Sequence, residues 1–432
     1  MLDSYFKISE NNSTIRTEVI AGFTTFLTMA YIIFVNPDIL AQAGIDRNAA
    51  FVATCLAAAV GTMLMGVVAN YPIALAPGMG VNAFFTYTVV IGGGYSWQIA
   101  LGAVFIAGLL FLILSLLPIR EWIINAIPRS QKMAIAAGIG LFLAIIALQN
   151  MSIVVDHPAT LVTLGDLSQP IVLLSIFCFL MMVTLEIRKI PGAIIISIFA
   201  TTIIGVMLGI SEFGGVMSMP PSLAPTFAQL DIAGAFNLGM TSIILAFLFV
   251  HMFDTAGTLV TVANSANLLD KDGKLPRLDK ALLADSTSML AGSVIGTSPV
   301  TSFIESTAGV NAGGRTGLTA VVVALLFLAS LFFAPLVSSI PSYATFPVLL
   351  FVACLMMRNI TEIDWEDMTE YVPAAITMIV MPLSFSIADG IGFGIITYAV
   401  LKVLSGKMDK SNIPVLVLAV VFISKYAFLG VH

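Results

Sequence analysis

Long apolar stretches separated by short polar loops run along the whole chain. A transmembrane helix needs about 20 predominantly apolar residues, and fourteen stretches follow this pattern. They lie near residues 17–42, 49–70, 73–91, 97–117, 131–153, 170–187, 191–210, 237–262, 282–296, 298–312, 317–339, 343–357, 373–387 and 388–405. Several are short for an ideal spanning helix, so we expect some to be half-helices. A further apolar stretch at 412–429 is expected to span, to re-enter or to lie at the interface.

Basic residues are concentrated in alternate loops. They precede the first stretch and follow the fourth, sixth, eighth and fourteenth, whereas the loops at 154–169 and 211–236 contain neither Lys nor Arg. The basic residues concerned are Lys7, Arg16, Arg120, Arg129, Lys132, Arg188, Lys189, Lys271, Lys274, Arg277, Lys280, Lys402, Lys407 and Lys410. Because cytoplasmic loops carry an excess of Lys and Arg, the pattern predicts a multi-pass protein of the cytoplasmic membrane with its N-terminus inside.

Composition supports a membrane protein and excludes several other classes. The chain is 59% hydrophobic and 10% charged, with a mean hydropathy of +1.05, whereas soluble domains carry about 25% charged residues. It has no basic run typical of nucleic-acid binding. The three cysteines form no metal or redox motif, and the phosphate-binding, zinc-protease and nucleophile-elbow motifs are all missing. We therefore expect no enzyme activity, no metal and no cofactor besides a proton gradient.

A weak internal repeat relates the second apolar stretch to the ninth. At a constant offset of 231 positions, Ala50 aligns with Ala281 and Gly61 aligns with Gly292. A shift of seven segments reverses the direction across the membrane. The repeat therefore predicts an inverted topology of seven plus seven segments, a common architecture of secondary transporters.

Proline and glycine interrupt two segments that occupy matching places in the two halves. Pro77 is followed by Gly78 and Gly80, and Pro299 follows Gly296. Proline disfavours helix in the residue before it, and glycine permits unusual dihedrals. We expect two short extended pieces, one ending at Pro77 and one at 296–301, each followed by a half-helix. Two simple packing kinks are the alternative interpretation.

Two carboxylates in apolar stretches are candidates for function. Asp254 lies deep in the eighth stretch, and Glu305 is expected in the first turn of the second half-helix. An ionised carboxylate at mid-bilayer costs on the order of 3 kcal/mol or more, so such residues are functional candidates by default. Each also has a structural interpretation. Ser302 and Glu305 have the spacing of a capping box, and Asp254 could accept hydrogen bonds from a broken segment.

Further polar residues accompany these carboxylates. His251, Asp254, Thr255 and Thr258 have the spacing of one helix face, so His251 is either a packing residue, a ligand contact or a proton relay. Asn82 lies in the first half-helix. Phe84 follows and could stack on a flat ring, although packing in the core is the stronger interpretation.

Asp285 and Arg315 lie close to predicted span ends. We expect them to reach water or to pair structurally.

Four separated motifs give the chain a family resemblance. They are FKISENNSTIRTEVIAGFTTFLTMAYIIFVNP at the start, ALAPGMGVNAFF, FDTAGT and TSFIESTAGVNAGGRTGLTAV. In this order they resemble the AzgA-like purine permeases of the nucleobase/ascorbate transporter superfamily, which share the fold of the bacterial uracil permease. The resemblance implies fourteen transmembrane segments in a seven-plus-seven inverted repeat. It also implies proton symport of hypoxanthine, guanine or adenine by a homodimer that works with an elevator-like motion.

The resemblance also implies a division of the chain and a set of site residues. A core domain would comprise residues 1–117 and 237–339, and a gate domain 118–236 and 340–432. The purine would be bound by Asn82, Asp254 and Glu305, with backbone groups near Gly80 and Ser302. Their place in the sequence adds Phe84, His251 and Thr258 as candidate contacts. Because a buried carboxylate can hold a proton near neutral pH, we expect Asp254 to carry the coupling proton, with Glu305 and His251 as the other candidates. Some relatives have a carboxylate at the position of His251, which leaves the preferred purine open.

Other functions remain as alternatives. The same fold could carry uracil, xanthine or a small anion, because a fold does not fix a substrate. A channel or receptor is disfavoured by the repeat with carboxylates at its centre. A membrane enzyme is disfavoured by the missing motifs.

Overall fold

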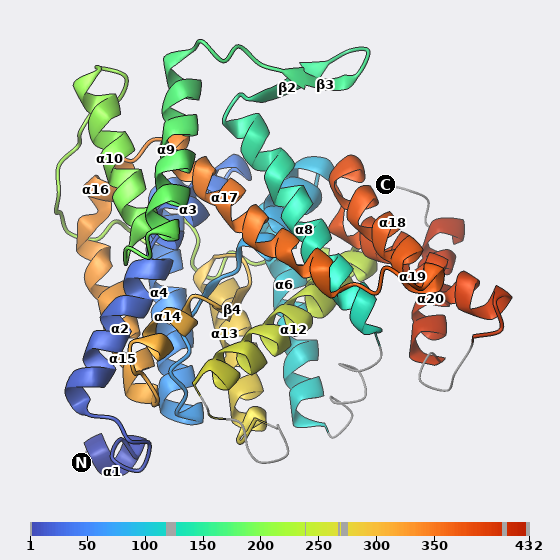
Figure 1. Cartoon of the computed structure of the whole chain (residues 1–432), viewed down its shortest axis with the longest axis horizontal. Helices are drawn as coiled ribbons and strands as arrows, with labels where there is room; N and C mark the ends of the chain where they lie inside the picture. The colour runs from blue at the N-terminus through green and yellow to red at the C-terminus, as the bar shows by residue number, and fades with distance from the viewer. Residues whose placement is uncertain are drawn as a thin grey trace.

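The computed structural model describes residues 2–117, 127–237, 239–266, 268, 275–407 and 413–428. Within these residues the chain is almost entirely helical, with four short strands (Figure 1). Some basic residues used to predict the orientation lie outside the described residues, namely Arg120, Lys271, Lys274 and Lys410.

The first half of the chain contains ten of the described α-helices, two π-helices and three strands. In order these are α1 (Leu2–Phe6), α2 (Ile15–Met29), α3 (Ile32–Gln42), α4 (Arg47–Leu64), η1 (Met65–Ala69), β1 (Leu75–Pro77), α5 (Met79–Ala83), η2 (Phe84–Gly92), α6 (Trp97–Leu116), α8 (Arg129–Asn150), β2 (Val154–His157), β3 (Leu161–Leu164), α9 (Pro170–Ile187), α10 (Ala193–Met207) and α11 (Ile232–Ala235).

The second half begins with the longest described helix. Its elements are α12 (Met240–Ser265), α13 (Leu278–Ile295), β4 (Val300–Ser302), α14 (Ser306–Asn311), α15 (Gly317–Ser330), η3 (Leu331–Phe333), α16 (Ala334–Ser338), α17 (Ser342–Met357), η4 (Arg358–Glu362), α18 (Met368–Ser384), α19 (Ile387–Leu404) and α20 (Ile413–Phe428).

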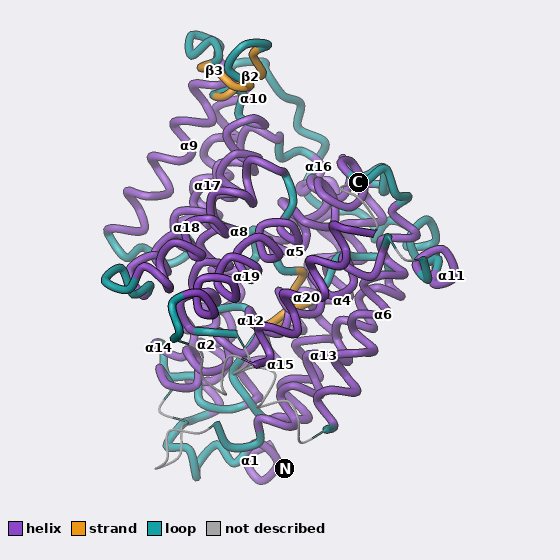
Figure 2. The backbone as a smooth tube through the Cα atoms, turned by 90° about the vertical axis from the view of Figure 1, so that its right-hand side faces the viewer, coloured by secondary structure: helices purple, strands orange, loops and turns teal. Residues whose placement is uncertain are grey.

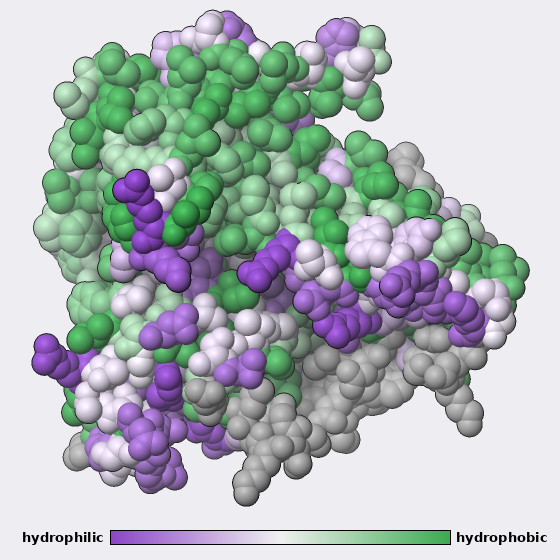
Figure 3. Space-filling model, in the orientation of Figure 1, coloured by the Kyte–Doolittle hydropathy of each residue, from purple (hydrophilic) through white to green (hydrophobic). Residues whose placement is uncertain are grey.

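Among the described residues, nine helical segments are long and apolar enough to cross a membrane. Large apolar side chains on α9 are exposed, including Leu173 at 53% and Leu180 at 57%. Figure 3 shows a broad hydrophobic surface over α9, α10 and α17, with hydrophilic residues gathered below it. Such a surface is costly in water and stable against lipid. The count of fourteen crossings and the inverted repeat remain predictions.

The two ends of the molecule differ in character. Helix α1 lies at one end, and the hairpin of β2 and β3 lies at the other, as both ribbon views show (Figures 1 and 2). Residues 154–169 were expected to form a loop, whereas residues 154–164 form an antiparallel hairpin with Val154 opposite Leu164. The hairpin and the basic N-terminal region therefore lie at opposite ends, as expected for opposite sides of a membrane.

Each predicted extended piece contains a short strand, and the two strands pair with each other, although the second covers Val300–Ser302 and not the whole of residues 296–301. Strands β1 and β4 are antiparallel, with Ala76 opposite Thr301, and every residue of both strands is buried. Thr62 on α4 accepts a hydrogen bond from Leu75 N and donates one to Leu75 O. Buried backbone groups in a membrane protein need partners inside the protein, and this pairing supplies them where the helices are interrupted.

Helices pack in two groups around these strands. Helix α8 packs mainly on α17 and α18, and α18 packs on α19. In the other group α13 packs on α4 and α6, and α15 packs on α2 and α4. The strand pair belongs to the second group, because β1 packs on α4 and β4 packs on α12 and α13.

Candidate functional site

The candidate site lies where α12 and α14 pack against the paired strands. Helix α12 contacts both β4 and α14, so it brings Asp254 close to the residues that follow β4. Glu305 ends the short link between β4 and α14 and is the N-cap residue of that helix. Two carboxylates from segments far apart in sequence therefore flank one strand.

Glu305 is held by the first half of the chain. The hydroxyl of Tyr31 donates a hydrogen bond of 2.6 Å to Glu305 Oε1, and Thr28 Oγ1 lies 3.4 Å from the Glu305 carbonyl oxygen. The second half-helix was expected to start directly after residue 301, with Glu305 in its first turn. It begins four residues later, at Ser306, because Ser302 belongs to β4 and Glu305 is the N-cap residue of α14. The predicted capping box does not form, because Ser302 Oγ donates to Asp285 and Glu305 makes no side-chain cap bond.

Asp254 is the open carboxylate of the site. Its side chain is exposed, and its one hydrogen bond among the described residues is a long one of 3.4 Å from Thr301 Oγ1. Gly257, Thr261 and Asn264 continue this exposed face toward the end of α12. A Cβ added at Gly257 would meet no atom within 4 Å. The open face therefore runs from Asp254 to the end of α12 that precedes the basic loop.

Asp285 lies behind the strand and is a closed carboxylate. His251 Nε2 lies 2.6 Å from its Oδ2, Thr255 Oγ1 donates to the same oxygen at 2.8 Å, and Ser302 Oγ donates to Oδ1 at 2.9 Å. Asp285 and His251 are fully buried. The expectation that Asp285 lies near a span end is wrong in position, because α13 begins at Leu278 rather than near 282 and places Asp285 two turns inside.

His251 belongs to this closed cluster. Sequence spacing placed it on one face with Asp254, but its ring bonds to Asp285 and packs edge-on against Phe111 at 5.3 Å between centroids. The other ring nitrogen, Nδ1, has no hydrogen-bond partner among the described residues. Thr255 also bonds to Asp285, and Thr258 is buried. The residues predicted to share one face are thus divided, with His251, Thr255 and Thr258 on a buried side and Asp254 on an open side.

Asn82 is tied to a second asparagine that sequence analysis did not select. Asn82 Nδ2 donates to Asn36 Oδ1 at 2.5 Å, and Asn36 Nδ2 donates to the hydroxyls of Thr54 and Thr297. Asn82 is fully buried, and its Oδ1 has no partner among the described residues. An unpaired buried acceptor is costly, so this oxygen is available to a ligand or a water.

The remaining predicted site residues contact other parts of the protein. Phe84 is fully buried and packs edge-on against Phe247 at 4.8 Å, which confirms its core interpretation. Gly80 lets α8 approach, because a Cβ there would lie 2.7 Å from Ile139 Cγ2. Ser302 directs its hydroxyl to Asp285 and not to Glu305.

Sequence reasoning missed Tyr31, Asn36 and the central place of Asp285. Tyr31 and Asn36 are polar side chains within the first apolar stretch, and an intramembrane polar residue is itself a functional signal. Tyr31 binds Glu305, 274 positions away, and Asn36 binds Asn82, 46 positions away. Local spacing therefore could not reveal which groups they bind.

Comparison with known proteins assigns nearly the whole chain to a family. The profile of a family described as "Permease family" matches residues 16–426. The adenine permease AdeP of Escherichia coli K12 is 47% identical over 432 residues, covering 100% of this chain and 97% of that protein. The guanine/hypoxanthine permease PbuG of Bacillus subtilis 168 is 46% identical over 440 residues, covering 99% and 100%. A protein of Methanocaldococcus jannaschii named as a permease is 54% identical over 430 residues and 99% of each chain.

Solved structures match the fold at low sequence identity. The transmembrane domain of the cyanobacterial bicarbonate transporter BicA aligns with a TM-score of 0.66 at 15% identity, covering 88% of this chain and 97% of that domain. The anion transporter SLC26A9 aligns with a TM-score of 0.62 at 11% identity, covering 95% and 69%. These similarities establish a mostly helical, polytopic membrane transporter fold. They do not indicate a substrate.

Proposed function

This chain belongs to the permease family whose profile it matches, and we propose that it carries purine nucleobases across the membrane in symport with protons. Family membership confirms the resemblance found in the four sequence motifs, and it makes the chain a multi-pass transporter and not an enzyme. Adenine and guanine/hypoxanthine permeases at 46–47% identity over nearly the whole chain support the substrate class.

The observation that carries the proposal is the pair of carboxylates beside β4. Tyr31 occupies one oxygen of Glu305, and the other oxygen remains to accept an N–H group. Asp254 keeps most of its acceptor sites, because it receives one long bond from Thr301. A purine ring presents several N–H groups in one plane, which two carboxylates can accept. Two negative charges at one site disfavour a small anion as the substrate.

Asp254 is our candidate for the coupling proton. An ionised carboxylate is costly inside the bilayer unless partners compensate it. Within the described part of the chain, Asp285 has three partners and Glu305 has Tyr31, whereas Asp254 has only the bond at 3.4 Å. Protonating Asp254 removes a charge from the carboxylate whose single hydrogen bond is the longest of the three sets. Proton binding at Asp254 would then let the loaded site cross an apolar barrier that opposes the empty, ionised site.

We further propose that the two groups of helices are the core and gate of an elevator-type transporter. The group containing the strands and the carboxylates would move, and the group containing α8, α17, α18 and α19 would remain in place. Gly80 on α5 touches Ile139 on α8, at a contact between the two groups. A small residue there keeps the surface smooth enough for sliding, since any Cβ would press into Ile139.

Uptake measurements test the function. Purified protein in liposomes should accumulate radiolabelled adenine, guanine or hypoxanthine when a proton gradient is imposed, and should only equilibrate them without it. Uracil, xanthine and bicarbonate serve as competitors. Accumulation of bicarbonate, or purine uptake that ignores the proton gradient, would contradict the proposal.

An engineered disulfide tests the motion. In a variant whose three native cysteines are replaced by alanine, Gly80→Cys and Ile139→Cys place two Cβ atoms 4.0 Å apart, within the usual disulfide range of about 3.5–4.5 Å. Gly292→Cys and Val300→Cys give a matched control inside the moving group, with Cβ atoms 3.7 Å apart. Oxidation should stop transport in the first pair, reversibly, and spare it in the second. Full transport with a verified Gly80–Ile139 crosslink would refute the motion.

A further inference from the structure

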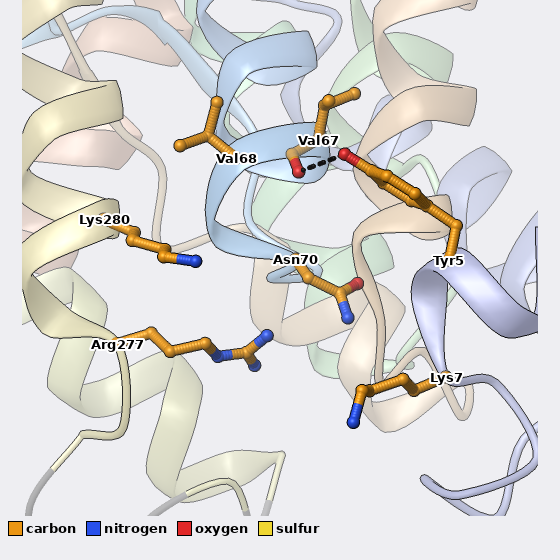
Figure 4. A pocket seen from close by; sticks show the side chains of 7 residues that line it. All are labelled: Tyr5, Lys7, Val67, Val68, Asn70, Arg277 and Lys280. Atoms are coloured by element: carbon orange, nitrogen blue, oxygen red, sulfur yellow. Dashed lines mark hydrogen bonds between the residues drawn. The ribbon is translucent and has the colours of Figure 1, made fainter.

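A basic pocket lies away from the candidate transport site, between the N-terminal tail and the start of α13. It has a volume of about 320 Å³ and is lined by Tyr5, Lys7, Val67, Val68, Asn70, Arg277 and Lys280. Figure 4 shows Arg277 and Lys280 extending from the start of α13 toward Asn70, with Lys7 on the opposite side. Three cations from two distant parts of the chain thus converge on one space.

The walls of this pocket are fixed by specific contacts. Asn70 Nδ2 donates to Phe6 O, and Gly317 N donates to Asn70 Oδ1, so Asn70 joins the tail to α15. The Tyr5 hydroxyl donates to Val67 O at 3.0 Å. The Arg277 guanidinium lies 4.9 Å from the centre of the Tyr71 ring, a cation–π contact that orients it. Specific contacts therefore hold the walls of this pocket in place.

The charges in the pocket are not balanced by its own lining, which contains no carboxylate. Lys7 pairs with Glu10 at 3.1 Å, on the exposed surface. Arg277 and Lys280 form no ion pair with a carboxylate of any described residue. Asp279 lies between them in the sequence and is exposed. The pocket thus favours an anion, and Arg is well suited to phosphate.

The position of the pocket identifies the source of that anion. Val67 and Val68, each 38% exposed, belong to the last turn of the candidate span Arg47–Ala69. With Val60 at 39% and the half-buried Leu64, they form an apolar strip that leads along α4 to the cations. Tyr5 is 56% exposed beside them, and tyrosine is typical of the membrane–water interface. A phospholipid bound here would place its acyl chains along the apolar strip and its phosphate beside the cations.

We propose that this pocket binds the phosphate headgroup of an anionic phospholipid, on the side of the membrane that the basic residues mark as cytoplasmic. The lipid phosphate contacts Arg277 and Lys280, with Lys7 from the tail on the far side of the headgroup. Its acyl chains lie along Val60, Leu64 and Val67. The bound lipid links α1 to α13 and so holds the N-terminal tail against the helix that carries Asp285.

Lipid retention in native mass spectrometry tests the site. The full chain in detergent is titrated with phosphatidylglycerol or with phosphatidylcholine of the same acyl chains. The wild-type protein should bind phosphatidylglycerol more tightly than phosphatidylcholine. The double variant Arg277→Gln/Lys280→Gln should weaken the binding of phosphatidylglycerol about 30-fold, at roughly fivefold for each cation removed. The control Arg188→Gln/Lys189→Gln removes the same charge from another exposed basic pair and should bind as the wild type does.

Several results would overturn the assignment. Equal binding of the two lipids, or unchanged phosphatidylglycerol binding in the Arg277→Gln/Lys280→Gln variant, would show that this pocket is not a lipid site. Displacement of the lipid by millimolar inorganic phosphate would assign the pocket to a soluble anion instead. If the double variant does not fold, Lys7→Gln/Lys280→Gln leaves the Tyr71 contact of Arg277 intact and should show the same loss.

Discussion

Asp254 and Asp285 lie on opposite sides of a short chain of hydroxyl groups, and their surroundings differ in almost every respect. Thr301 donates to Asp254 at 3.4 Å, and its hydroxyl lies 3.1 Å from that of Thr255, which donates to Asp285. Among the described residues, Asp285 is fully buried with three partners, whereas Asp254 is exposed with one. Because each threonine hydroxyl gives its single proton to its own carboxylate, the two hydroxyls are in contact without a hydrogen bond between them, and His251 lies on the buried side of the row.

These surroundings suit Asp285 to a structural role and Asp254 to a role in transport. A buried carboxylate that is fully hydrogen-bonded orders its neighbours and is expensive to disturb. A carboxylate with one long bond and open space in front can exchange a proton or meet a ligand with little rearrangement. We therefore expect a substitution of Asp285 to lower the stability of the protein and a substitution of Asp254 to impair transport.

The largest effect is expected from Asp285→Ala. It leaves His251, Thr255 and Ser302 without their common acceptor, and breaking a buried pair in this way costs about 3–5 kcal/mol. The apparent unfolding temperature of the purified protein in detergent should fall markedly. Asp254→Ala is the matched control and should leave that temperature near the wild-type value. Equal loss of stability in the two variants would remove the distinction between the closed and open sides.

Asp254→Asn should instead abolish accumulation while the protein stays folded. The amide mimics the protonated carboxyl and cannot release a proton, so the driving force is no longer coupled to the purine. Labelled purine should exchange across the membrane of proteoliposomes, but its internal concentration should only reach the external one. If the variant still accumulates purine with the pH dependence of the wild type, the proton is carried elsewhere, and His251 and Glu305 are the next candidates.

Glu305→Gln should weaken purine binding by about 10- to 100-fold, since a hydrogen bond to a charged group contributes about 1.5–3 kcal/mol. Isothermal titration with the preferred purine measures this loss. In Glu305→Gln the binding of the purine itself is weakened, whereas in Asp254→Asn the purine still binds and its coupling to the proton is lost. Wild-type affinity in the Glu305→Gln protein would leave Glu305 with no role beyond its contact with Tyr31.

Tyr31→Phe should have the smallest effect, a loss of purine affinity of about fivefold. It removes one hydrogen bond to Glu305 Oε1, typically worth about 1 kcal/mol, and keeps the ring in the core. The same titration applies, and the double variant with Glu305→Gln should be no weaker than Glu305→Gln alone. Additive losses would mean that Tyr31 acts on the purine independently of Glu305.

Local sequence signals predicted the interrupted segments better than the polar contacts. Pro77 and Pro299 mark positions where helix cannot continue, so the short extended pieces and the half-helix that follows Pro77 could be predicted from residue chemistry. Asp254 and Glu305 stood out because carboxylates are rare in apolar stretches.

Partners between distant segments could not be predicted. The bond from Tyr31 to Glu305 joins residues 274 positions apart, and that from Asn36 to Thr297 joins residues 261 apart. Helical spacing also grouped His251 with Asp254, although packing against α13 directs His251 to Asp285. Which side chains meet depends on how the helices pack together, and no local pattern along one helix contains that information.

The paired strands also constrain how the protein is made. Ala74 N donates to the hydroxyl of Ser306, 232 residues later in the chain, and the ladder partner of β1 among the described strands is β4. At about 5–20 residues per second, the ribosome needs roughly ten to fifty seconds to deliver that partner. Until then, residues 75–77 have backbone groups that lipid cannot satisfy. The newly inserted first half therefore needs the insertion machinery, a chaperone or the membrane surface to provide partners for these groups. Truncated chains that end before β4 should be rapidly degraded.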